Sequence, residues 1–207
     1  MFFARKFDPA NANLTGFASN KTGAGPWTMT ATSSGDGLAH QVSIRNDAAT
    51  DHSGKTVTLV GTDANGKAQT EVVTGPGSSA TVESTKYFLT LTTATPSATI
   101  STDTFDFGWV DEWASEDIPL NPENPTLPMF AAVQTGTMNW DIEVALPPSS
   151  AFTNQTDNLW VNDTNFTAKT ATVAATSLAL RGSAARVVCN SYTDTADLTI
   201  YGMVPGV

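Results

Sequence analysis

The chain has 207 residues, only 14% of them charged, and its 20 acidic and 10 basic side chains leave a net charge of −10. This acidity argues against nucleic-acid binding, which needs a basic surface to neutralise phosphates, and more weakly against binding to anionic membranes. The single cysteine, Cys189, excludes an intrachain disulfide framework and a multi-cysteine metal site, and no apolar run approaches the ~20 residues of a membrane span.

Residues 1–22 are expected to form an extended N-terminal arm. Phe2, Phe3 and Phe7 lead into a turn-rich stretch, and no apolar core typical of a secretory signal follows. Three aromatic side chains are not expected on the surface of a solitary soluble domain. They therefore either dock onto a neighbouring chain or fold back onto the body of this one.

Residues 23–110 are expected to form a first β-sandwich or barrel-like domain. Threonine makes up about one residue in six of the chain, and its branched Cβ favours strands. Apolar and hydroxyl-bearing positions alternate, as in Gln41–Arg45, where Val42 and Ile44 would point inward. Turn signals recur about every 8–12 residues, a spacing typical of antiparallel sandwiches and barrels.

Two local patterns in this domain are specific. The dipeptide Asn65-Gly66 favours a type I′ turn, so Thr56–Gly61 should pair antiparallel with Ala68–Thr74. Three aromatic residues at a spacing of two should share one face of a later strand: Phe105, Phe107 and Trp109.

Residues 111–128 differ in composition, with five acids and prolines at every third position from 119 to 128. This pattern favours an extended, polyproline-like strap, and we expect the domain boundary here. The acidic pairs Asp111-Glu112 and Glu116-Asp117 could serve hydrolysis or bind calcium. The interpretation we favour is that they solvate the linker.

Residues 129–207 are expected to form a second β-sandwich, jelly-roll-like, ending in a hairpin with Asp194 near its turn. The chain has no convincing helical periodicity longer than about two turns, so helix should be scarce. Val173–Arg181 is the best helical candidate, although the β-branched Val173 and Thr176 weaken it.

Candidate sites for chemistry are few. His52 lies between Asp51 and Ser53, but neighbours in a turn cannot adopt the geometry of a catalytic triad, and local turn hydrogen bonds explain the motif better. His40 lacks a second histidine at metal-ligand spacing. The sequence contains no calcium-loop motif, and “GPGSSAT” lacks the ending of a phosphate loop. We therefore expect no catalytic residue, no cofactor and no metal.

The five tryptophans could form a platform on which a carbohydrate stacks. Trp27, Trp109, Trp140 and Trp160 each fall in a strand phase consistent with a core. Trp113 is the exposed candidate, in the strap. A carbohydrate-binding adhesin module is therefore kept as an alternative from a different functional class.

Several stretches of the chain resemble the small structural proteins of tailed-bacteriophage virions. “GDGLAHQVSIRNDAATDHSGKTVTLVGTDANGKAQTEVVTGPGSSATVESTKYFLTLTTA” and “ATISTDTFDFGWV” carry this resemblance, and “AARVVCNSYTDTADLTIYGMV” is similar to the ending of many phage head or fibre β-domains. The resemblance covers most of residues 27–204 and includes no catalytic motif. It implies a symmetric assembly without enzyme activity, located in the virion on a capsid, neck or tail.

From the residues and the resemblance together we expect a capsid decoration or cement protein. It would form a homotrimer and clamp the major capsid protein or other virion subunits, without nucleic-acid or membrane partners. The alternative within the same class is a neck, tail or head-fibre component. The expected contact residues lie in the arm and the strap: Phe2, Phe3, Phe7, Trp113, Ile118 and Leu120.

Overall fold

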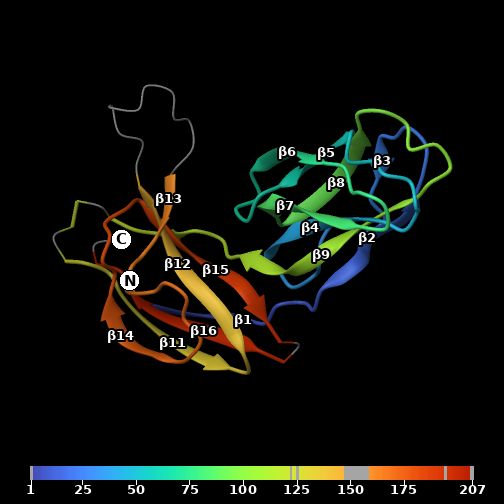
Figure 1. The fold of residues 1–207 in the computed structure, drawn as a ribbon. Coiled ribbons are helices and arrows are strands. Elements are labelled where there is room, and N and C mark those ends of the chain that lie inside the picture. Colours follow the sequence, from blue (N-terminus) through green and yellow to red (C-terminus); the bar gives the residue numbers. More distant parts are fainter. Residues whose placement is uncertain (1, 122, 125, 147–158, 194, 206–207) are drawn as a thin grey trace. The chain divides into compact units, whose positions relative to one another are not determined.

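The structure is a computed structural model that describes residues 2–121, 123–124, 126–146, 159–193 and 195–205 (Figure 1). Within these residues the elements of regular secondary structure are all β-strands, which confirms the all-β prediction. The helical candidate Val173–Arg181 contains strand β14 (Val173–Ser177) instead, in keeping with its β-branched residues. The chain divides into two compact units, each described separately below. Unit 1 comprises Met1–Pro9 and Ser115–Val207, and unit 2 comprises Ala10–Ala114.

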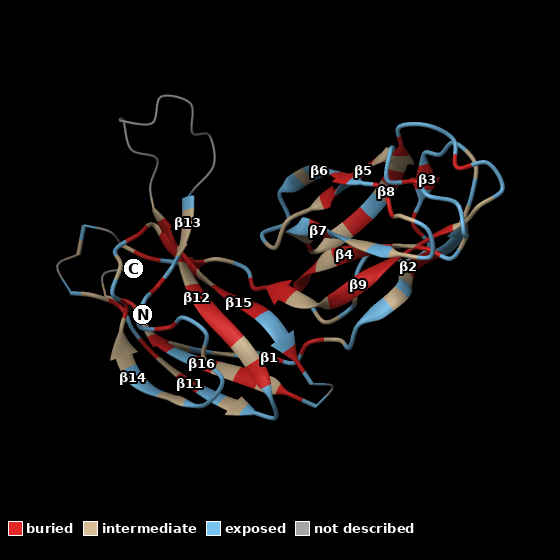
Figure 2. Ribbon diagram, in the orientation of Figure 1, coloured by how far each residue is buried: buried red, intermediate tan, exposed pale blue. Residues whose placement is uncertain are grey.

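Unit 2 contains two antiparallel sheets. In one, the strands pair in the order β2-β9-β4-β7; in the other, the order is β3-β8-β5-β6. Apolar side chains from both sheets form one buried core, a sandwich-like arrangement visible as buried strands in Figure 2. The strands are β2 (Asn13–Lys21), β3 (Trp27–Thr28), β4 (Ala39–Asn46), β5 (Thr56–Thr62), β6 (Ala68–Thr74), β7 (Thr81–Phe88), β8 (Thr90–Pro96) and β9 (Phe105–Ala114).

The alternation read from the sequence accounts for the central strands of unit 2. Val42 and Ile44 of β4 are fully buried, as predicted. The three aromatic residues of β9 also lie in the core, which confirms their shared face. Between them, Gly108 lies against the backbone of β2, and a Cβ there would stand 1.8 Å from the carbonyl oxygen of Asn13. A glycine at this position is therefore what lets β2 cross β9 closely.

The β5–β6 hairpin pairs as predicted, with Thr62 opposite Ala68 at its closed end. The turn type is different. Gly66 has a φ of +75°, but Asn65 does not share the left-handed region that a type I′ turn requires. Gly66 N–H donates to the Asp63 carbonyl at 3.0 Å, and Asp63 N–H donates to the Lys67 carbonyl at 2.9 Å. This pattern is that of a longer loop built on a type I turn, and the Asp63 carboxylate stabilises it by accepting from two further backbone N–H groups.

Unit 1 also contains two antiparallel sheets. One has the order β1-β16-β11-β14; in the other, β15 pairs with β12 and β10, and β12 pairs with β13. Phe130, Trp140 and Phe166 are among its fully buried side chains. The strands are β1 (Phe2–Phe7), β10 (Ile118–Pro119), β11 (Met129–Thr135), β12 (Met138–Leu146), β13 (Leu159–Asn162), β14 (Val173–Ser177), β15 (Ala184–Tyr192) and β16 (Asp197–Met203).

The segments expected to be an arm and a strap belong to the sheets. Residues 2–7 form β1, which pairs along its whole length with β16. Of the two alternatives for the arm, the structure therefore shows the one in which it folds back onto its own chain. Residues 13–21 form β2 of unit 2. In the strap, residues 111–114 end β9, and residues 118–119 form β10 against β15. An extended segment satisfies its backbone N–H and C=O groups most fully by joining a sheet. Pro122 and Pro125 lie outside the described residues, as does Asp194 near the terminal turn.

Candidate functional site

The first polar cluster surrounds His52 of unit 2, which is 2% exposed. Lys55 Nζ lies 2.9 Å from His52 Nδ1, and His52 Nε2 lies 2.9 Å from Asp103 Oδ2. Because an ammonium group can only donate, Nδ1 accepts and Nε2 carries the proton that is donated to Asp103. Hydrogen bonds from Thr50 and then His52 lower the pKa of Asp103. The cluster thus joins the loop at residues 50–55 to the loop at Asp103.

The sequence motif at residues 51–53 predicted the local turn but not the partner of His52. Asp51 does accept a hydrogen bond from Ser53 N–H at 2.8 Å, as the turn interpretation predicts. The true partner of His52, Asp103, is 51 residues away along the chain, and no local pattern points to it.

The second cluster surrounds His40, whose side chain is 1% exposed. Its Nδ1 lies 3.0 Å from the Val110 carbonyl oxygen, and its Nε2 lies 2.8 Å from Asp36 Oδ2. Both partners are acceptors, so the arrangement is complete only when both ring nitrogens carry a proton and the imidazole is charged. In that form the ring and Asp36 make a buried ion pair.

Asp36 collects several further donors. Burial alone would raise the pKa of this carboxyl group, but the hydrogen bond from His40, then those from Ala10 and Ser34, outweigh it and hold the pKa well below its usual range. Leu38 N–H also donates, at 2.9 Å. The pair ties together the start of unit 2, the residue 34–38 turn and the strand ends nearby, which is a structural role.

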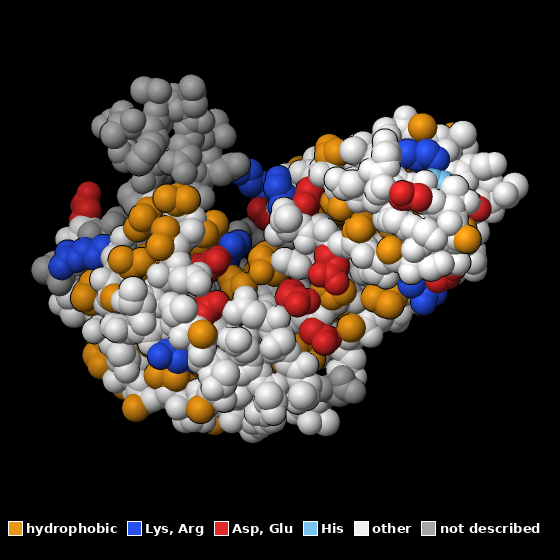
Figure 3. Space-filling model, viewed as in Figure 1, with side chains coloured by type: hydrophobic (Ala, Val, Ile, Leu, Met, Phe, Trp, Pro, Cys, Tyr) orange, Lys and Arg blue, Asp and Glu red, His pale blue; other side chains and the backbone are white. Residues whose placement is uncertain are grey.

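The acidic pairs do not form a metal site in the described part of the chain. Glu116 makes an ion pair with Arg5 of β1 at 2.9 Å. Burial raises the pKa of Glu112, and the neighbouring charges of Glu83 and Asp111 raise it further. Within the described residues no group of three histidine, cysteine, aspartate or glutamate side chains could hold a metal ion. On the side drawn in Figure 3, charged groups occur as small separate patches among hydrophobic and other uncharged surface.

The most distinctive surface lies on the sheet β1-β16-β11 of unit 1. Strand register places Phe2, Met203 and Met129 in one row across it, and Ala4, Tyr201 and Ala131 in the next. Residues two apart point to the same side of a strand, so both rows stand on one side of the sheet. We call this side the apolar face, and define it by its seven apolar members: Phe2, Ala4, Met129, Ala131, Val133, Tyr201 and Met203. Val133 lies in a third row on this side, together with Thr199 and Lys6.

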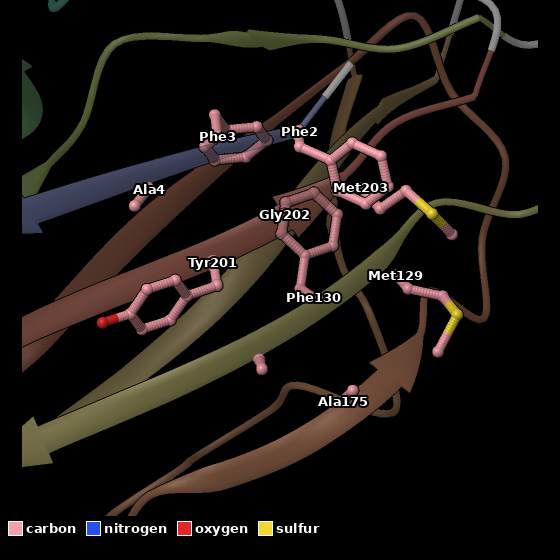
Figure 4. A pocket seen from close by; sticks show the side chains of 10 residues that line it. Phe2, Phe3, Ala4, Met129, Phe130, Ala175, Tyr201, Gly202 and Met203 are labelled. Carbon is pink, nitrogen blue, oxygen red and sulfur yellow. The ribbon is translucent and has the colours of Figure 1, made fainter.

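Large side chains of the apolar face are exposed. Phe2 is 82% exposed, Tyr201 49%, Val133 45% and Met129 37%. Phe2, Tyr201 and Met129 line a hollow of about 620 Å³, together with the small residues Ala4, Ala131, Ala175 and Gly202. Figure 4 shows Phe2, Met203 and Met129 grouped at one end of this hollow, with Tyr201 farther along β16.

The opposite side of the same sheet supports the hollow from below. Phe3 and Phe130 both pair with Gly202, and their rings meet edge to face at 6.0 Å. A Cβ on Gly202 would stand 2.2 Å from the Phe3 ring, so glycine leaves the space that this ring occupies. Phe130 in turn packs against Phe166 in the core. The apolar face is therefore held by buried packing beneath it.

The six residues expected to make contacts fall into two groups. Phe2 is exposed and Phe3 half-buried, and both line the hollow. The other four are buried: Phe7, Trp113, Ile118 and Leu120. Trp113 was the exposed tryptophan of the sequence interpretation, and that expectation is wrong, because the residue is fully buried. Trp27, Trp109 and Trp140 are buried as predicted, whereas Trp160 is only half-buried.

Sequence reasoning missed the partners of Phe2 on the apolar face. Met129 and Tyr201 come from strands distant in sequence, and only the pairing of both β1 and β11 with β16 brings them together.

The described residues include no helix long and apolar enough to span a membrane. Comparison of the chain with family models, curated proteins and solved structures gave no match.

Proposed function

We propose that this chain is a structural protein of a tailed-phage virion, and that it serves as a capsid decoration or cement protein. The observation that carries the proposal is the apolar face, where Phe2 is 82% and Tyr201 49% exposed, whereas most other aromatic side chains among the described residues are buried. Contiguous apolar surface of this kind marks an interaction site. The resemblance of residues 27–204 to phage virion proteins supports the choice of assembly.

The proposed mechanism is burial of surface between subunits. Stable protein contacts bury roughly 1,200–2,000 Å² in total, and repetition over a symmetric shell multiplies weaker contacts through avidity. The proposed partners are other copies of this chain, as a homotrimer, and the major capsid protein. The net charge of −10 supports a position away from packaged nucleic acid. We also propose that each compact unit is a sandwich domain in its own right.

The geometry bears differently on the two alternatives, a neck, tail or head-fibre position and a carbohydrate-binding module. A neck, tail or head-fibre position would use the same apolar face and stays open. A carbohydrate-binding module depended on an exposed indole at Trp113, which is buried. Trp160 is half-buried, and the Arg186 guanidinium lies 4.2 Å from the centre of its ring, so one of its two ring faces is already covered.

Labelling of phage particles tests the proposal. An antibody against this chain should decorate intact virions, at regular positions on the capsid for the decoration role. Label confined to the neck or tail would support the alternative position. Particles free of label, or turnover of a small substrate by the purified chain that one substitution abolishes, would contradict the structural role.

A further inference from the structure

We propose that the apolar face binds the apolar face of a second copy of this chain. The inference rests on the proposed function and names one partner of the surface that carries it. Two properties of the face point to a second copy, namely the absence of charged side chains around its hollow and its shape, and its size limits the strength of the contact.

Charge restricts where two copies can meet. Each carries a net charge of −10, so most approaches place like charges together. None of the ten residues that line the hollow carries a charged side chain. Lys6, the basic residue of β1 on the same side of the sheet, lies in the row of Val133 and is paired with Asp197 at 3.1 Å. Two copies that meet through this face therefore avoid opposing unpaired charges, which would cost binding energy.

The face also offers a projection and a recess of its own. Phe2, 82% exposed, stands beside a hollow whose lining includes Ala4, Ala131, Ala175 and Gly202. In a two-fold contact the same surface serves both partners. Each copy would then place its Phe2 ring in the hollow of the other, while Tyr201, near the middle of the sheet, approaches its own symmetry mate.

Size makes the contact weak by itself. Four strands about 4.8 Å apart and about seven residues long at 3.3 Å per residue cover roughly 440 Å². A face-to-face pair thus buries roughly 900 Å², below the ~1,200 Å² of a stable complex. Such a pair forms at high concentration or within an assembly, where other contacts contribute. A trimer would need a second, heterologous contact.

Sedimentation of the full chain between about 10 μM and 1 mM tests the inference. We expect a monomer–dimer equilibrium that strengthens as salt is added, since salt screens the repulsion between acidic copies. Tyr201→Glu should weaken dimerisation at least tenfold, because two carboxylates would meet near the axis. Val72→Glu adds the same charge at a 61% exposed position of β6 and should leave dimerisation almost unchanged.

A second measurement covers the case in which Tyr201→Glu disturbs folding. Cys189 is fully buried, so Tyr201→Cys introduces one accessible thiol. Under mild oxidation it should form disulfide-linked dimers much faster than Val72→Cys. A wild-type monomer at 1 mM, a dimer equally sensitive to both glutamate variants, or equal cross-linking of both cysteine variants would overturn the inference. If virions are labelled but the chain is monomeric, the proposed function stands and only the inference of a dimer fails. If virions are not labelled but the chain dimerises, only the proposed function fails.

Discussion

Replacement of Asp36 by alanine would remove one partner of the buried Asp36–His40 pair. The two side chains are 6% and 1% exposed, so His40 Nε2 would lose its acceptor where little water can replace it. Loss of one member of a buried ion pair costs about 3–5 kcal/mol, because the other is left uncompensated. Backbone N–H groups of Ala10 and Leu38 would also lose their acceptor. We expect the free energy of unfolding to fall by about 3–5 kcal/mol at pH 7.

The pH dependence of this loss follows from the lowered pKa of Asp36. A carboxyl group with a pKa depressed on folding contributes stability above its unfolded pKa, about 3.9, and that contribution declines as pH falls towards the folded pKa. The difference between wild type and Asp36→Ala should therefore shrink by about 1 kcal/mol between pH 5 and pH 3. Below that range it should shrink further.

Urea titrations followed by tryptophan fluorescence at several pH values would measure both effects. Asp47→Ala is the matched control, because Asp47 is 55% exposed and pairs only at the surface with Arg45. It should change stability by less than about 1 kcal/mol. A similar small change for Asp36→Ala, or a loss independent of pH down to 3, would refute the assignment of a buried ion pair.

Three further predictions follow from backbone packing. Gly61→Ala should lower the free energy of unfolding by about 3 kcal/mol in urea titrations, because its Cβ would stand 1.8 Å from the Thr90 carbonyl oxygen, whereas Gly54→Ala meets open space and should be neutral. Deletion of residues 1–8 should lower the melting temperature measured by calorimetry, because β16 loses a strand partner and the core loses a buried phenylalanine. A fragment of residues 10–114 should give a dispersed NMR spectrum, because its first strand β2 pairs with its last strand β9; a collapsed spectrum would contradict its independence.

The sequence predicted those parts of the fold that depend on neighbours along the chain. The alternation that buries Val42 and Ile44 in β4 is a local property, and so is the Asn65-Gly66 signal that joins β5 to β6. The turn type was wrong because the Asp63 side chain stabilises a longer loop. Asn-Gly thus located the hairpin without determining its geometry.

The prediction of an extended linker at residues 111–128 failed in part because it rested on the average composition of the whole segment. Its prolines and acids favour exposure, yet Ile118 and Leu120 are buried on either side of exposed Pro119. This alternation at a spacing of two is a strand signal, and it was present in the sequence. Trp113 likewise belongs to the end of β9, two residues beyond the acid that was taken to begin the linker.

The N-terminal residues are part of a sheet, and this affects how the proposed contact through the apolar face would form. Division of the chain into consecutive domains assumed that neighbours in sequence fold together, but unit 1 takes β1 from the start of the chain and β16 from its end. Phe2 is therefore fixed on the edge strand of a sheet, supported from below by Phe3 and Phe130. A surface already held in place loses less conformational entropy on binding than a free arm would. Removal of the leader would damage the sheet as well as the contact, so Tyr201→Glu distinguishes the two effects where a deletion cannot.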